Sequence, residues 1–404
     1  MMKSSFLCCL IFINLVTAYT FVAKPSTTRH SIHHIEFVSV DHSSAASHLS
    51  KILNIPNSPT LFHSHHQSLV SHNDLRLLVT SSSLSAATKQ FLKDSGNLSV
   101  FAVCIQVDDA EQSYKAAVEA GAKGVLEPCL SDSNSDSITS NCVVAETILY
   151  GDVRLRFLSG AGADRTSPSP TPNSISNSNS NSKSKLNRVD HCVGNVPSKF
   201  YDSTISAIKR QLNYSEFAEF LTSEVGTEES GLNSVVLSSE SGKVLLPINE
   251  PVNGSRKSQI QTYLDLNEGR GGVQHLAIES GDIFETVRMM REVEGMGGAN
   301  NEFNFEMMER PVEEYFDGLG ERLGGRLSCE QVEQCRELGV LADYDKEGVL
   351  LQIFTKPVGE RATFFFEIIQ RVGCSTPGCG GFGKGNFKAL FKSIEAYERK
   401  QGLA

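Results

Sequence analysis

The sequence predicts an α+β protein in which tandem βαβββ units form two open-barrel domains. Short runs rich in β-branched and aromatic residues recur along the chain, and each half also contains an amphipathic helix between such runs. A stretch rich in serine, asparagine and proline separates the two sets of runs, as is typical of a disordered linker. With 404 residues, 40% of them hydrophobic and 21% charged, the chain is long enough to fill two cores.

The first domain is expected over residues 31–160. Strands are predicted at 35–40, 75–79, 98–105 and 153–158, and a helix at 109–120 carries Ala116, Ala117 and Ala120 at helical spacing. The linker is expected at 161–187, where apolar residues are almost absent. We expect this first domain to be non-catalytic, because it lacks a full set of metal ligands.

The second domain, residues 188–404, repeats the pattern. Strands are predicted at 189–193, 217–221, 235–237, 244–246, 273–278, 349–354 and 364–369, with a helix at 282–292. This recurrence is the reason for predicting tandem units of one kind in both halves.

The chain closes with a glycine-rich segment and a helix. Residues 378–383 match GxGxxG by letter, but too few residues follow to complete a dinucleotide-binding βαβ unit, so we interpret the glycines as a hinge. Asn386 is the expected N-cap of a helix over 386–400. One face of that helix is apolar, with Phe387, Leu390, Phe391, Ile394 and Tyr397.

One carboxylate stands inside an otherwise apolar strand, Glu367 in FFFEIIQR at 364–371. A buried ionised carboxylate needs a partner, and a metal ion is a strong one. His191 and His275 lie on strand-like runs of their own. A single histidine on such a strand is more often a hydrogen-bonded core residue, but two imidazoles and one carboxylate together predict a mononuclear non-haem Fe(II) site.

The first half offers no such set. Aligning residues 103–105 with 276–278 puts Ala102 where His275 stands, and the strand at 153–158 carries arginine rather than glutamate. The metal is therefore expected in the second half.

Composition narrows the class of partner. The formal charge is −10, the isoelectric point is about 5.6, and lysine and arginine form no dense stripe. Nucleic acid and anionic membrane surfaces are therefore not expected, and a small molecule is. The ten cysteines show no zinc-site spacing. Cys374 and Cys379 flank a short turn that a disulfide could close, but reduced thiols are expected in a chain with this much core.

Residues 1–30 are expected to be a targeting segment. Lys3 precedes a short apolar run that ends at the small-residue site Val16, Thr17, Ala18, as in a secretory signal. Residues 19–35 then contain no acidic residue, as in transit peptides. A signal followed by a transit-like stretch predicts a plastid protein, with the secretory pathway or the cytoplasm as alternatives. No membrane span is expected in the mature chain.

Several motifs together resemble the 4-hydroxyphenylpyruvate dioxygenase family. In the second half they are DHCVGNV at 190–196, GLNSVVL at 231–237, LPINEP at 246–251, KSQIQTY at 257–263, QHLA at 274–277, LLQIFTKP at 350–357, FEIIQR at 366–371 and GGFGKGNF at 380–387. The first half adds HHIEF at 33–37 and GDVRLRF at 151–157. The resemblance covers nearly all of residues 187–400.

This resemblance implies a vicinal-oxygen-chelate fold, a homodimer, and Fe(II) held by His191, His275 and Glu367. It implies that 4-hydroxyphenylpyruvate and O2 react to give homogentisate and CO2, in tyrosine catabolism or in the supply of plastoquinone and tocopherol precursors. It also implies that the helix over 386–400 is a lid that closes over the substrate.

The resemblance also assigns residues around the metal. Polar residues that fix the ends of the substrate are Ser234, Asn249, Gln259, Gln274 and Gln352. Residues that hold its ring or close the pocket are Phe354, Phe365, Phe382, Asn386 and Phe387. For Phe365 and Phe382, plain core packing is an equally good interpretation.

Two alternatives stay open. A 4-hydroxymandelate synthase would share the fold, metal and substrate but oxidise the side-chain carbon; Asn249, Gln259 and the lid motif favour attack on the ring instead. A non-catalytic binding member of the fold is the other, and the presence of all three ligands counts against it.

Overall fold

The computed structural model describes residues 29–55, 65–131, 138–160, 163, 184–226, 230–294, 305–361 and 363–402. Most of the predicted targeting segment, residues 1–28, and most of the predicted linker, residues 161–162 and 164–183, lie outside these ranges. Among the helices described, none is both long and apolar enough to cross a membrane.

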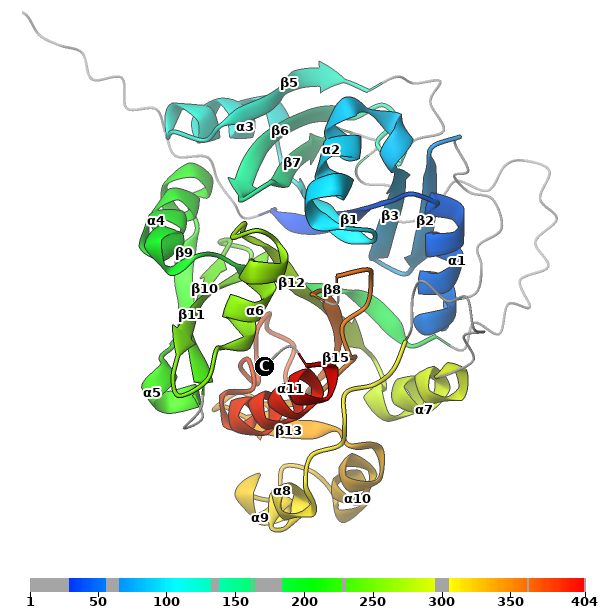
Figure 1. Cartoon of the computed structure of the whole chain (residues 1–404), viewed down its shortest axis with the longest axis vertical. Helices are drawn as coiled ribbons and strands as arrows, with labels where there is room; N and C mark the ends of the chain where they lie inside the picture. The colour runs from blue at the N-terminus through cyan, green and yellow to red at the C-terminus, as the bar shows by residue number, and fades with distance from the viewer. Residues whose placement is uncertain are drawn as a thin grey trace, which may run out of the picture.

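The first half of the chain forms a seven-stranded sheet in the order β2-β3-β1-β4-β7-β6-β5, drawn in blue to green in Figure 1. Its strands are β1 (Ser31–Ser39), β2 (Gln67–His72), β3 (Leu75–Ser81), β4 (Ser99–Gln106), β5 (Gly124–Leu130), β6 (Val143–Tyr150) and β7 (Val153–Ser159). The four predicted strands correspond to β1, β3, β4 and β7, whereas β6, most of whose residues are buried, was not predicted.

The second half forms an eight-stranded sheet in the order β13-β14-β15-β12-β8-β11-β10-β9. Its strands are β8 (Leu186–Asn195), β9 (Ser215–Phe220), β10 (Ser230–Ser238), β11 (Leu245–Asn253), β12 (Gly272–Ser280), β13 (Leu341–Tyr344), β14 (Val349–Phe354) and β15 (Phe365–Val372). Each of the seven predicted strands of this half overlaps one of these elements.

The two sheets share their central pairing, which confirms the predicted α+β class built from repeated units. β1 pairs antiparallel with β4 and β4 parallel with β7, as β8 pairs antiparallel with β12 and β12 parallel with β15. Three units read βαβββ, and the first reads βαββ within the described residues. The halves also pack together, since the ring of Phe37 on β1 lies 5.4 Å from that of Phe364 beside β15. The exact domain boundaries stay a prediction.

Several helices begin at residues whose side chains cap the first turn. The side chains of Asp109 and Asp282 accept hydrogen bonds from the first turns of α3 (Ala110–Glu119) and α7 (Ile283–Val293), the two predicted crossover helices. The other helices of eight or more residues outside the C-terminus are α1 (His42–Ile52), α2 (Ala86–Ser95), α4 (Tyr201–Leu212), α6 (Gln259–Leu266) and α10 (Cys329–Leu338). Shorter ones are α5 (Thr222–Val225), α8 (Glu313–Phe316) and α9 (Leu319–Arg322).

The predicted C-terminal helix is α11 (Phe387–Gln401), drawn in red in front of the second sheet in Figure 1. Its predicted cap is wrong in one respect. Asn386 occupies the N-cap position, but its side chain makes no capping bond. Instead its Nδ2 donates to Gln352 Oε1 over 2.8 Å and its Oδ1 accepts from the Tyr315 hydroxyl over 2.6 Å, so the residue ties the helix to the sheet.

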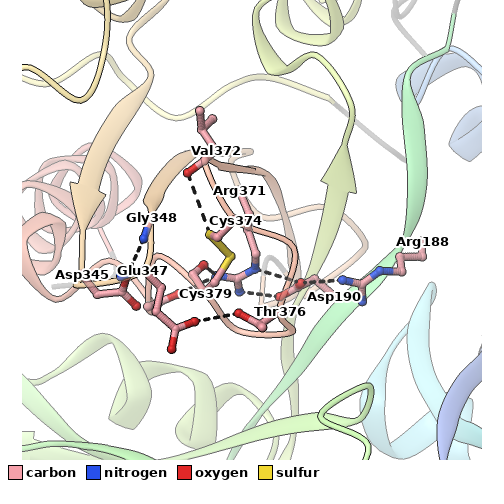
Figure 2. Close-up of a disulfide and its surroundings, with 11 residues drawn as sticks. Arg188, Asp190, Asp345, Glu347, Gly348, Arg371, Val372, Cys374, Thr376 and Cys379 are labelled. Carbon is pink, nitrogen blue, oxygen red and sulfur yellow. Dashed lines mark hydrogen bonds and ion pairs between the residues drawn. A yellow bond between two sulfur atoms is a disulfide. The ribbon is translucent and has the colours of Figure 1, made fainter.

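The expectation of reduced cysteines is wrong for one pair. Cys374 and Cys379 form a disulfide in the loop between β15 and α11 (Figure 2). A large core was the reason to expect free thiols, but this loop is glycine-rich and has few apolar side chains of its own to hold it. The other cysteines described, Cys104, Cys129, Cys142, Cys192, Cys329 and Cys335, keep reduced thiols.

Candidate metal centre

The second sheet curves around a cavity, and α11 lies across it. Side chains from β8, β10, β11, β12, β14 and β15 all face this space. Every site residue predicted from the sequence lines it: His191, Ser234, Asn249, Gln259, Gln274, His275, Gln352, Phe354, Phe365, Glu367, Phe382, Asn386 and Phe387. The fold thus brings together residues that are far apart in the chain.

Three of these residues meet at the inner wall, on neighbouring strands. His191 Nε2 and His275 Nε2 each lie 3.2 Å from Glu367 Oε2. The two imidazole rings are 5.9 Å apart at 75° to each other. All three groups are therefore close enough to share a single ion.

A β-bulge aims one of the histidines. The pairing of β12 with β8 shifts register between Val273 and His275. The shift breaks the alternation of side chains along the strand, so Gln274 and His275 both face the cavity. Without it, one of the two would point to the other face of the sheet.

The donor set fits a divalent transition metal. The Asp190 carboxylate accepts from His191 Nδ1 over 2.8 Å, and Gln274 Oε1 accepts from His275 Nδ1 over 2.9 Å. Both imidazoles therefore carry a proton on Nδ1, which leaves Nε2, the atom nearest Glu367, to bind a metal ion. Two imidazoles and a carboxylate on one face, with the cavity opposite, make the facial arrangement typical of non-haem iron sites.

Comparison with known proteins agrees with this geometry. The chain is 44% identical over 404 residues to a 4-hydroxyphenylpyruvate dioxygenase of Plectranthus scutellarioides, covering 92% of this chain and 89% of that one. It is 42% identical to one from Arabidopsis thaliana, covering 91% and 87% of the two chains. The chain belongs to the 4-hydroxyphenylpyruvate dioxygenase family. No family model matches the sequence.

Solved structures support the fold. A triple mutant of 4-hydroxymandelate synthase from Streptomyces coelicolor superposes with a TM-score of 0.69 at 24% identity, covering 93% of this chain and all of that one. A fusion of a xylose isomerase-like barrel with a 4-hydroxyphenylpyruvate dioxygenase gives 0.62 at 18% identity, covering 92% of this chain and 53% of that one. At these identities the likeness shows the fold alone, which is the vicinal-oxygen-chelate fold predicted for the dioxygenase family.

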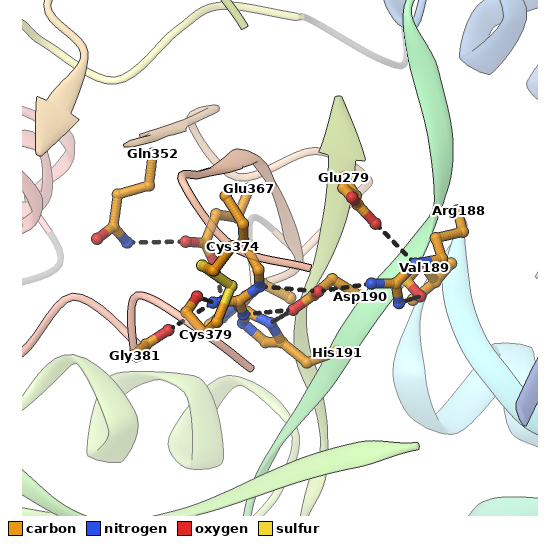
Figure 3. A network of polar contacts seen from close by, with 12 residues as sticks. Arg188, Val189, Asp190, His191, Glu279, Gln352, Glu367, Cys374, Cys379 and Gly381 are labelled. Atoms are coloured by element: carbon orange, nitrogen blue, oxygen red, sulfur yellow. Dashed lines mark hydrogen bonds and ion pairs between the residues drawn. A yellow bond between two sulfur atoms is a disulfide. The ribbon is translucent and has the colours of Figure 1, made fainter. Parts of the chain in front are cut away.

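Each of the three predicted ligands has a polar partner of its own. Asp190, which is fully buried, orients His191, and Gln274 orients His275. Gln352 Nε2 donates to Glu367 Oε1 over 2.7 Å (Figure 3). Such partners fix the orientation of a ligand and tune its basicity.

The electrostatics of the site favour ionised Glu367. Burial raises its pKa, but the hydrogen bonds and charges of the two histidines outweigh this and lower it to about 2. Burial lowers the pKa of His275 by more than Glu367 raises it. Burial also lowers the pKa of His191, but bonds to Asp190 and Glu367 leave that pKa above its usual value. The carboxylate is thus anionic at neutral pH, which is the form that binds a metal ion.

Aromatic rings form much of the remaining wall. Phe365 stacks on His275 with ring centres 4.8 Å apart, and Phe382 meets His191 edge-on at 5.2 Å. Phe354 lies at right angles to His275 at 6.4 Å. Phe387 stands at the start of α11, in contact with the ring of Phe220 at 5.5 Å.

Amide and hydroxyl groups form the polar part of the wall. Gln274 Nε2 donates to Gln259 Oε1 over 2.6 Å, and Asn249 Nδ2 donates to Gln274 Oε1 over 3.3 Å. Ser234 on β10 pairs directly with Asn249 on β11. The amides of Asn249, Gln259 and Gln274 form one hydrogen-bonded set that reaches His275.

Sequence reasoning missed three residues that support the site. Asp190 was part of a motif, but its contact with His191 was not predicted; a carboxylate inside a buried strand is the same signal that identified Glu367. Tyr315, which binds Asn386, lies in a segment without a predicted element. Arg371 closes the run that contains Glu367, and its side chain is only 4% exposed.

Proposed function

We propose that this chain converts 4-hydroxyphenylpyruvate and O2 to homogentisate and CO2, with Fe(II) held by His191, His275 and Glu367. The observation that carries the proposal is the convergence of these three groups, each with its own polar partner, on the wall of one cavity. When bound, the iron supplies O2 activation and a chelating site for the 2-oxo acid. Asp190, Gln274 and Gln352 keep the ligands oriented for it.

The cavity suits a flat phenol with a 2-oxo acid chain. The faces and edges of Phe354, Phe365 and Phe382 hold a phenyl ring. Gln259, Asn249 and Ser234 bind the polar groups of the substrate, because amides and hydroxyls bind a phenol or carboxylate without competing strongly for iron.

The lid excludes water from the reaction. Phe387, Leu390, Phe391 and Ile394 of α11 face the cavity. Further along the helix, Glu395 accepts from Ser230 Oγ over 2.8 Å. These contacts hold α11 shut over bound substrate, and opening it admits the next molecule.

Product identification tests this function. The chain is loaded with Fe(II) without air, given 4-hydroxyphenylpyruvate and O2, and compared with a Glu367→Ala variant. We expect homogentisate from the parent and none from the variant. 4-Hydroxymandelate would assign the chain to the synthase reaction, and no O2 uptake by folded, iron-loaded protein would leave a binding module.

We also propose that residues 1–30 direct the chain to a plastid. Fusing residues 1–40 to a fluorescent reporter separates plastid from secretory routing, and a cytosolic reporter would contradict both. We also propose that the chain forms a homodimer, as is expected for this family. Light scattering coupled to size-exclusion chromatography measures the mass of the assembly and tests this directly.

A further inference from the structure

We propose that the Cys374–Cys379 disulfide controls how tightly the centre holds its metal, acting through Arg371 and Asp190, and that a dithiol reductant switches it. The inference rests on the proposed function in one respect, that His191 is a metal ligand. Asp190 and Arg371 are then positioning residues, since neither faces the cavity.

The first link of the proposed route runs from the metal ligand His191 through Asp190 to Arg371. Asp190 Oδ2 accepts both from His191 Nδ1 over 2.8 Å and from Arg371 Nη2 over 2.7 Å, and Arg371 Nε lies 3.1 Å from Asp190 Oδ1. Asp190 is fully buried and the Arg371 side chain is 4% exposed. A paired, two-point contact of this kind fixes the carboxylate, and the carboxylate fixes the imidazole.

The second link of this route runs from Arg371 to the loop that contains the disulfide. Arg371 Nη1 donates to the carbonyl oxygen of Cys379 (Figure 2) and, over 2.8 Å, to that of Gly381. One guanidinium therefore holds Asp190 with one edge and the loop with the other. Figure 3 shows His191 bound to Asp190, together with Cys379 and Gly381 of the loop.

The loop depends on the disulfide and on Arg371 because its glycine-rich backbone can adopt many conformations. Gly373, Gly378, Gly380 and Gly381 all have positive φ, between 76° and 85°. Glycine reaches such conformations without strain but loses the most entropy when ordered. The disulfide closes residues 374–379 into a small ring and limits that freedom.

The same loop carries Phe382 into the cavity. The guanidinium of Arg371 lies 5.6 Å from the centre of the Phe382 ring, which itself packs against His191. Loosening the loop therefore removes two constraints on His191, the aromatic edge on one side and the oriented carboxylate on the other.

The switching step is a thiol–disulfide exchange. Cys374 is partly exposed and Cys379 is buried, so an incoming thiolate attacks Cys374 Sγ and expels the Cys379 thiolate. The second thiol of the reductant then attacks the mixed disulfide and releases Cys374. The protein gains two electrons and two protons, and the dithiol leaves as its own disulfide.

Metal affinity in the two redox states tests the proposal. The metal-free full chain, oxidised or reduced with dithiothreitol and desalted under argon, is titrated with Co(II) by calorimetry and by visible absorption, which reports the ligand geometry. We expect reduction to weaken Co(II) binding by about tenfold or more, in the range for loss of an outer partner. A Cys374→Ser/Cys379→Ser variant should match the reduced parent and should not respond to dithiothreitol, which excludes effects at the other cysteines.

Two arginine variants test the route. Arg371→Lys keeps the charge opposite Asp190 but cannot hold Asp190 and two carbonyls together, so it should bind Co(II) weakly in both redox states. Arg188→Lys is the matched control: Arg188 also touches Asp190, over 3.3 Å, but its other ion pair is with Glu279 rather than with the loop. It should keep the full response to reduction.

The outcomes separate this inference from the proposed function. Equal Co(II) affinity of oxidised and reduced parent overturns the inference and leaves the function standing. A response to reduction that persists in Arg371→Lys overturns the route through Arg371. No Co(II) binding by the parent in either state overturns the metal site itself.

Discussion

The seven-stranded sheet forms the first barrel and the eight-stranded sheet the second, and the two bury charged side chains at equivalent strand positions in different ways. In the second, Ala277 on β12 lies opposite His191 on one neighbouring strand and Glu367 on the other. His275 lies two residues before Ala277 on the same strand, and the β-bulge falls at Gln274, directly before His275. A ring of ligands therefore surrounds space for a cation.

In the first barrel the corresponding residue is Cys104. It lies opposite His34 on β1 and Arg156 on β7, and Ala102 stands two residues before it, after a register shift of the same kind. The register thus confirms the alignment predicted from the sequence. One histidine position is kept, the second is alanine, and the carboxylate is an arginine.

That arginine serves as the cation of the first barrel. Its Nη1 lies 2.7 Å from Glu36 Oε2 and its Nη2 lies 2.7 Å from Glu146 Oε1. Arg154 also lies 2.6 Å from Glu146, and guanidinium groups are always protonated, so two arginines balance the two carboxylates without an ion. The first barrel therefore holds its central positive charge as a side chain, and the proposed metal ion would take that place in the second.

The first barrel does bring His33, His34 and Cys104 within 4.8 Å of one another. Arg156 Nη1 lies 3.4 Å from His34 Nε2, which must accept because a guanidinium only donates. His34 then carries its proton on Nδ1 and donates it to His33 Nδ1 over 2.8 Å. Two neutral imidazoles bonded to each other account for this cluster. The lone pairs of His34 Nε2 and His33 Nδ1, which a metal ion would need, already accept hydrogen bonds.

The largest effect on turnover is expected where the second barrel loses its central carboxylate. Glu367→Gln keeps the size of the side chain but removes the charge between the imidazoles. We expect homogentisate formation to fall by more than the about 100-fold caused by losing an outer partner of a ligand. Iron content after desalting and product formation measure this. A folded variant that keeps one iron per chain would contradict the assignment.

A smaller effect is expected where one ligand loses its orientation. Gln274→Met removes the acceptor of His275 Nδ1 at nearly constant volume, and metal affinity should fall by about 10- to 100-fold. Gln274→Glu keeps an acceptor at that place and should restore part of the affinity. Calorimetric titration with Co(II) compares the three proteins, and equal affinities would show that the amide acts on substrate alone.

The lid contact should matter less again. Tyr315→Phe removes the hydroxyl that donates to Asn386 Oδ1 at the start of α11. One hydrogen bond contributes about 1 kcal/mol, so we expect about a fivefold change in KM and faster proteolysis of α11. Tyr344→Phe is the control, since Tyr344 is 40% exposed and outside the cavity lining. Equal proteolysis of both variants would count against a role for Tyr315 in closing the lid.

Much of the second barrel could be predicted because its strands are apolar and its charged residue is exceptional. Glu367 stood out for that reason and led to the two histidines. Among the strands that were missed, β6 is largely buried, but β2 is QSLVSH and most residues of β5 are exposed. Such segments form strands through pairing with neighbours, which periodicity does not show.

Geometry at the level of single contacts could not be predicted. The bulge that turns Gln274 and His275 to the same side depends on how β8 and β12 register, and the disulfide depends on the path of a glycine-rich loop. Asn386 shows the same limit: its residue type fits a cap, but Gln352 and Tyr315 are in reach and take its side chain.

The smallest effect on turnover is expected in the first barrel, although the effect on stability is large. Glu146→Gln removes a buried charge that faces Arg154 over 2.6 Å and Arg156 over 2.7 Å. Breaking a buried ion pair from one side leaves uncompensated charge and should lower the free energy of unfolding by about 3 kcal/mol. Chemical denaturation measures that loss, while turnover per folded molecule should stay at the parental value because no residue of this cluster lines the cavity. Loss of iron from folded Glu146→Gln protein would mean instead that the arginine-centred barrel supports the metal-centred one directly.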